Sequence, residues 1–203
     1  MLSLQNNIRP NLAGDYPQID PTALIDPSAQ IIGNVKIGKD VFVGPLTVIR
    51  ADQRGPDGKV APIQIDNEVS IQDNVIMHAD PGASVIIGPK TSIAHGVVVH
   101  GPCTIGQECF IAVRATLYKV TLEDNVWIGI GSIAKLVTLQ SFTRVPAGAV
   151  IRDRPEVLAL RLVSDKERKY MEDVWAANTR LRSDYLELRD KLESIRASVK
   201  NRA

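Results

Sequence analysis

The chain of 203 residues has three histidines, His78, His95 and His100, and all three lie within one window of 23 residues. Three neutral imidazoles that leave one coordination position open form a ligand set that activates water at a zinc ion. The alternative is three surface or interface histidines without a metal. The chemistry therefore depends on whether the surrounding elements bring these side chains together.

An aliphatic residue recurs every six positions through most of the chain, and this period decides the expected fold. It runs through Ile19, Ile25, Ile31, Ile37, Val43 and Ile49, resumes at Ile65, Ile71 and Met77, and resumes again from Ile87 to Leu117. Each interruption exceeds a multiple of six by four residues, which predicts loops at about 51–62 and 79–86. Repeats of a fixed short period indicate a solenoid.

Pairs such as Ile37-Gly38 and Val43-Gly44 resemble the hexapeptide repeats of left-handed parallel β-helices. In that fold three hexads form one triangular coil of 18 residues, and the aliphatic residue of each hexad points inward. Neighbouring coils stack at the strand spacing of about 4.8 Å. We therefore expect a mainly β protein, with a left-handed β-helix domain and an N-terminal extension over residues 1–155.

Beyond Pro155 the period becomes helical, which predicts a C-terminal α-helix within residues 156–203. Ser164 and Glu167 have the spacing of a capping box, which marks a helix start. An apolar stripe follows at spacings of three and four: Met171, Val174, Leu181, Tyr185, Leu188, Leu192, Ile195 and Val199. Such a helix can lie along the solenoid or pair with copies of itself, and Asn178 within the stripe can fix its register.

The hexad positions of the histidines predict how they meet. His78 and His100 both occupy the second position of a hexad and are 22 residues apart, which is one coil of 18 plus a four-residue loop. Removing the loop stacks them roughly 5 Å apart on one face, close enough to share a metal. His95 occupies a third position on another side of the triangle. A homotrimer can supply it from a neighbouring chain.

Composition narrows the function classes. The net charge of +1 provides no long-range field for nucleic acid or an anionic membrane. We find neither an N-terminal signal pattern nor an apolar stretch of about 18 residues, so we expect a cytoplasmic protein that does not bind membranes. Cys103 and Cys109 fall on different faces of a coil, which favours buried free thiols over a disulfide.

Three segments carry a resemblance to gamma-class carbonic anhydrases, over about residues 18–186: Ile49–Asp52, Ile71–His78 and Ser92–Pro102. The resemblance implies a homotrimer with metal sites at subunit interfaces, holding zinc or, alternatively, iron or cobalt. It assigns His78 and His100 as ligands from one subunit and His95 as the ligand from its neighbour. It also implies a C-terminal helix packed on the solenoid.

The same resemblance assigns roles to five further residues. Arg50 and Asp73 match residues that pair across the interface, and Asp52 belongs to that network. Gln72 matches a glutamine that hydrogen-bonds the metal-bound water. Asn178 matches an asparagine on the C-terminal helix that helps to orient carbon dioxide. The network of Arg50, Asp52 and Asp73 can also be purely structural, holding the trimer together.

The activity implied is reversible hydration of carbon dioxide to bicarbonate by a metal-bound hydroxide, a lyase reaction. Two alternatives stay open: a metal-binding relative that acts as another hydrolase or in coenzyme A thioester metabolism, and a noncatalytic scaffold. A hexapeptide acyltransferase is disfavoured, because its chemistry uses one histidine as base.

The chain departs from active family members that carry a long acidic loop after the first histidine. Here a short loop, Ala79–Ser84, follows His78, and Gln53 stands where those members have a glutamate. Gln53 cannot accept a proton, so the sequence leaves the proton acceptor unassigned. The chain thus resembles the branch of the family without the acidic loop.

Overall fold

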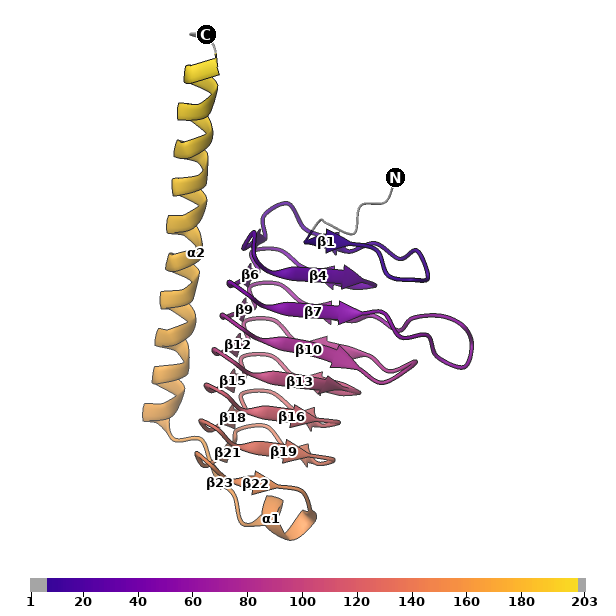
Figure 1. The fold of residues 1–203 in the computed structure, drawn as a ribbon. Coiled ribbons are helices and arrows are strands. Elements are labelled where there is room, and N and C mark those ends of the chain that lie inside the picture. The colour runs from indigo at the N-terminus through magenta and orange to yellow at the C-terminus, as the bar shows by residue number, and fades with distance from the viewer. Residues whose placement is uncertain (1–6, 201–203) are drawn as a thin grey trace.

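A computed structural model describes residues 7–200, with side chains up to residue 198. Residues 1–6 of the predicted N-terminal extension and the side chain of Val199 therefore lie outside the described part. The chain winds into a left-handed β-helix, and the long C-terminal helix α2 (Asp165–Lys200) runs beside it (Figure 1). None of the helices within residues 7–200 is long and apolar enough to cross a lipid bilayer.

Three sheets form the sides of the solenoid, and their strands are stacked coil upon coil. Sheet A consists of β1 (Ile8–Arg9), β4 (Gln30–Gly33), β7 (Val48–Ala51), β10 (Ile76–Ala79), β13 (Val98–Gly101), β16 (Thr116–Tyr118), β19 (Ile133–Lys135) and β22 (Val150–Ile151). Sheet B consists of β2 (Gln18–Ile19), β5 (Val35–Ile37), β8 (Ile63–Ile65), β11 (Val85–Ile87), β14 (Cys103–Ile105), β17 (Thr121–Leu122) and β20 (Thr138–Leu139).

Sheet C faces α2. It consists of β3 (Leu24–Ile25), β6 (Phe42–Val43), β9 (Ser70–Ile71), β12 (Ser92–Ile93), β15 (Phe110–Ile111), β18 (Trp127–Ile128), β21 (Thr143–Val145) and β23 (Arg161–Leu162). Within residues 7–200 the strands of successive coils pair in parallel, whereas β23 pairs antiparallel with β21 and Arg54 forms an isolated antiparallel bridge with Val60. The short helix α1 (Arg154–Leu158) precedes β23. The predicted domain boundary at residues 155 and 156 thus falls inside α1.

The hexapeptide period produces the core, as predicted. The aliphatic residue of each hexad points inward, and the largest fully buried side chains include Ile31, Ile49, Ile71, Met77, Ile93 and Leu117. Cys103 in β14 and Cys109 directly before β15 are buried free thiols, which confirms that expectation too. The interruptions of the period are loops, residues 52–62 between β7 and β8 and residues 80–84 between β10 and β11.

The helix α2 crosses sheet C from the later coils toward the first. Tyr170 packs edge-on against Phe110, the Trp175 indole N–H donates to the Glu68 carbonyl, and Tyr185 stacks on Phe42. Beyond Tyr185 the helix continues past the first coil (Figure 1), so Leu188, Leu192 and Ile195 are exposed. The solenoid therefore packs against the first half of the stripe and leaves the second half largely uncovered.

Glu167 anchors the start of α2 to the solenoid. The predicted capping box forms: the Ser164 N–H donates to the Glu167 carboxylate at 3.0 Å, and the Glu167 N–H donates to the Ser164 hydroxyl at 3.3 Å. The same carboxylate accepts hydrogen bonds from Arg144 of β21 and Arg161 of β23. The hydrogen bonds from Arg161 and Ser164, led by that from Arg161, hold the pKa of Glu167 far below its usual range.

We expect Glu167→Gln to lower the free energy of unfolding at pH 7 by about 2 kcal/mol, because the variant weakens hydrogen bonds between charged groups. Since the folded pKa lies below the ordinary 4.5, this stabilisation is complete above that pH and is lost as the pH falls below it. Urea denaturation at pH 7 and at pH 3.5 measures both effects. Exposed Glu187 on the same helix, changed to Gln, is the control. Equal differences at the two pH values would contradict the assignment.

Candidate metal centre

His78 and His100 stand side by side on the outer face of sheet A. They are partners in the parallel register of β10 and β13, and their ring centroids lie 5.5 Å apart. The stacking predicted from the 18-residue coil is therefore confirmed. Burial, followed by the nearby Arg50 charge, lowers the pKa of His78. The imidazole is thus neutral near pH 7, which is the form that binds metals.

Two of the predicted site residues, Asp52 and Arg50, lie next to His78. Asp52, which directly follows β7, has Oδ1 3.2 Å from Nε2 of His78, and its Oδ2 accepts a hydrogen bond from Arg50 at 2.7 Å. The structure thus brings Arg50, Asp52, His78 and His100 together at the edge where the strands of sheet A end. Asp57, in the loop between β7 and β8, accepts the N–H of Lys59 within its own turn.

Three residues that the sequence analysis did not assign surround His100. Tyr118 stacks on its ring at 5.4 Å, Asp80 Oδ1 lies 3.8 Å from Nδ1, and Lys119 Nζ lies 2.5 Å from Asp80 Oδ2. The Lys119 hydrogen bond lowers the pKa of the Asp80 carboxyl. Tyr118 was foreseeable, because it follows His100 by one 18-residue coil. Asp80 was not, because its position depends on the loop conformation.

His95, Gln72 and Asp73 form a second group at the opposite edge of sheet A, where the chain turns out of sheet C. His95 Nδ1 lies 3.3 Å from Asp73 Oδ2, and Gln72 donates to the Ser70 hydroxyl. Gly44 makes room here, since a Cβ at that position would lie 2.7 Å from Asp73 Oδ1. The His95 side chain is 54% exposed, so it is open to a ligand or a neighbouring molecule.

The second group borders a groove of about 760 Å³ between the first coils and α2. Apolar side chains from both walls line it, among them Leu24, Phe42, Leu181 and Leu188, together with Gln72, Asp73 and His95. Asn178 lies half-buried on α2 just before this groove but is not among the lining residues. No hydrogen bond within residues 7–200 joins it to either group of site residues.

The two groups do not meet within one chain. Among residues 7–200, no three side chains of the kinds that ligate metals converge closely enough to hold an ion. A largely aliphatic column in register separates the groups on the outer face of sheet A and consists of Val48, Ile76, Val98, Thr116, Ile133 and Val150. Ile76, in this column, is 45% exposed.

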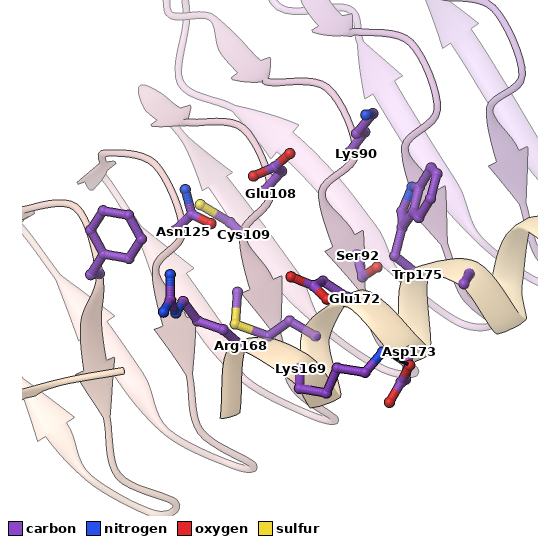
Figure 2. A pocket seen from close by; sticks show the side chains of 13 residues that line it. Lys90, Ser92, Glu108, Cys109, Asn125, Arg168, Lys169, Glu172, Asp173 and Trp175 are labelled. Carbon is purple, nitrogen blue, oxygen red and sulfur yellow. Dashed lines mark hydrogen bonds and ion pairs between the residues drawn. The ribbon is translucent and has the colours of Figure 1, made fainter. Parts of the chain in front are cut away.

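A further cavity, of about 530 Å³, lies between sheet C and the start of α2 (Figure 2). Glu108, Glu172 and Trp175 line it, and the buried Ser92 hydroxyl has no hydrogen-bond partner in the described residues. None of the histidines lines this cavity. It is therefore distinct from the candidate metal centre.

The fold defines the class of protein: a hexapeptide-repeat left-handed β-helix. A hexapeptide transferase family protein from Anaplasma phagocytophilum has the same fold, with a TM-score of 0.69 over 85% of this chain and 95% of that one, at 24% identity. A comparison with the models of known protein families gives no match.

Curated relatives narrow the class to a family. Over 181 residues the chain is 33% identical to the carbonic anhydrase of Methanosarcina thermophila, covering 79% of this chain and 71% of that protein. It is also 33% identical over 170 residues to a carboxysome assembly protein, CcmM, of Synechocystis, but spans only 24% of that longer protein. The chain belongs to the gamma carbonic anhydrase family.

Proposed function

We propose that this protein is a metal-dependent carbonic anhydrase that hydrates carbon dioxide reversibly at the subunit interfaces of a homotrimer. The observation that carries the proposal is the division of the three histidines. One edge of sheet A presents His78 and His100 at ligand spacing, and the opposite edge presents His95 with Gln72 and Asp73. The site is complete only when the second edge of a neighbouring copy meets the first edge.

The surface between the two edges supports a threefold assembly. A heterologous contact that joins one edge to the other forms a ring when its rotation closes, and three copies around an axis then give three equivalent sites. The exposed aliphatic column of sheet A lies between the edges, where such a contact would bury it. Exposed apolar surface of this kind marks contacts between proteins.

The residues present fit a metal ion. Burial keeps His78 neutral, and Nδ1 of His100 is buried without a hydrogen-bond partner among the described residues, which leaves its Nε2 as the nitrogen for a ligand. Bound zinc, or iron or cobalt in its place, supplies positive charge that lowers the pKa of water toward about 7. Three imidazoles accept any of these metals.

The chain's own residues then have separate tasks. Asp52 orients His78, and Arg50 is placed to exchange its intrachain partner for Asp73 of a neighbouring copy. Gln72 is buried beside Asp73, where its amide can hydrogen-bond the reacting oxygen. Asn178 is assigned to orienting carbon dioxide from α2. The short loop after His78 supplies no glutamate, so buffer is expected to contribute to removing the proton.

Stopped-flow measurement of carbon dioxide hydration, on anaerobically purified protein of known metal content, tests the activity. We expect near-stoichiometric metal and hydration well above that of the metal-stripped protein, with both lost in His100→Ala. Metal without hydration would reject the anhydrase and favour another substrate or an assembly subunit. Absence of metal would reject the site.

Mixed assemblies test the shared site directly. We expect His95→Ala and His100→Ala each to lose the metal, because each removes one ligand from every site. Refolding the two variants together in equal amounts restores about a quarter of the sites, because a site is intact only where a wild-type His95 meets a wild-type His100 from the neighbour. A site built within one chain would restore none.

Ile76→Lys tests the aliphatic column as the interface. We expect this variant to sediment as a monomer and to lose the metal, because a charge would be buried at the contact. Ile86→Lys is the matched control, since Ile86 is 41% exposed on the outer face of sheet B. A trimer that survives Ile76→Lys would place the interface elsewhere.

A further inference from the structure

Each histidine of the candidate metal centre faces one carboxylate of its own chain. Asp52 lies 3.2 Å from His78, Asp73 lies 3.3 Å from His95, and Asp80 lies 3.8 Å from His100. The first two carboxylates fall in the motifs that carry the family resemblance. The third comes from the loop after β10, and no role has been assigned to it.

Two aromatic rings pack against His100, whose side chain is 31% exposed. Tyr118 stacks on one face, and His78 meets it edge-on with an interplanar angle of 75°. Its Nδ1 atom is buried and lacks a hydrogen-bond partner in the described residues. An unpaired buried donor is costly, so this nitrogen needs an acceptor when it carries the proton.

The short loop places Asp80 as that acceptor. Asp80 directly follows β10, its N–H points to the Gly101 carbonyl at 3.4 Å, and its own carbonyl accepts the Ala83 N–H at 3.0 Å. The carboxylate therefore lies beside the next coil, on which His100 stands. A shift of about 1 Å would bring Asp80 Oδ1 within hydrogen-bond distance of Nδ1.

Lys119 holds the other oxygen of the same carboxylate. Its Nζ atom lies 2.5 Å from Asp80 Oδ2, while Oδ1 faces His100. Both side chains are partly exposed, and such ion pairs contribute little to stability. The ion pair instead fixes the orientation of the Asp80 carboxylate, because it prevents that group from turning away from His100.

We infer that Asp80, held by Lys119, is a positioning residue that keeps the proton of His100 on Nδ1 and so presents Nε2 to the metal. Carboxylates that accept a hydrogen bond from a ligating histidine fix its tautomer and orientation, and their loss typically lowers metal affinity about 10- to 100-fold. The inference rests on the proposed function, in which His100 is a ligand.

The first test is made without metal. With three histidines in the chain, long-range ¹H–¹⁵N spectra of the metal-stripped protein at pH 7.5 report each tautomer separately. We expect His100 to carry its proton on Nδ1 in the wild type and in Asp80→Asn, whose amide oxygen still accepts. In Asp80→Ala we expect a mixture. An unchanged tautomer in Asp80→Ala would overturn the inference.

The second test measures zinc affinity by competition with a chromophoric chelator. We expect Asp80→Ala to weaken binding about 10- to 100-fold, Asp80→Asn to retain most of the affinity, and Lys119→Ala to fall between them. Lys135→Ala is the matched control, because Lys135 also lies over the Tyr118 ring, whereas the ion pair of Asp80 within the described residues is with Lys119. The double variant Asp80→Ala/Lys119→Ala should be no weaker than Asp80→Ala.

The outcomes separate the inference from the proposed function. Wild-type protein that binds no zinc would reject both. Wild-type protein that binds zinc, with Asp80→Ala binding equally well, would reject only the positioning role. If Asp80→Ala melts at a much lower temperature than the wild type, its zinc affinity cannot be compared, and Asp80→Asn and Lys119→Ala are used in its place. If both of these variants bind zinc as tightly as the wild type, the inference is overturned.

Discussion

The structure depends on one constraint: parallel strands of successive coils must stay in hydrogen-bonded register. An aliphatic residue at about every sixth position fills the interior, so a coil without an inserted loop takes 18 residues in the first part of the solenoid and 17 in the later part. Register then converts a sequence separation into a place on the surface. His78 and His100 meet because their separation of 22 residues contains one coil and one loop, and not because any local motif joins them.

The same constraint prevents a single chain from completing the proposed metal site. Strands in a coil are short and straight, so residues at the two ends of one strand of sheet A cannot turn toward one another. His95 lies before β13 and His100 near its end, and the rigid strand keeps them apart. In the proposed function, the stiff scaffold therefore provides two half-sites. Assembly of copies is the arrangement by which such half-sites can be joined.

Loops and the C-terminal helix modify this scaffold without disturbing its register. The loop of residues 80–84 is short enough to fix Asp80 beside His100, where a longer loop would leave the carboxylate free to move. The Glu167 network fixes the start of α2 on sheet C, and stacking of Tyr185 on Phe42 guides the helix to the first coil. Beyond that coil the solenoid offers no surface on which the helix can pack.

The sequence by itself determined the period, the inward residues, the two loops, the helix start at Ser164 and the stacking of His78 on His100. These features follow from counting residues, because the number of residues between two strands sets the register in which they pair. Only the tertiary structure decided that Asp80 and Lys119 lie beside His100 and that a largely aliphatic column separates the two histidine groups. It also decided that α2 extends beyond the first coil of the solenoid. Those features depend on loop conformation and on which side chains another element covers, and neither is fixed by spacing along the chain.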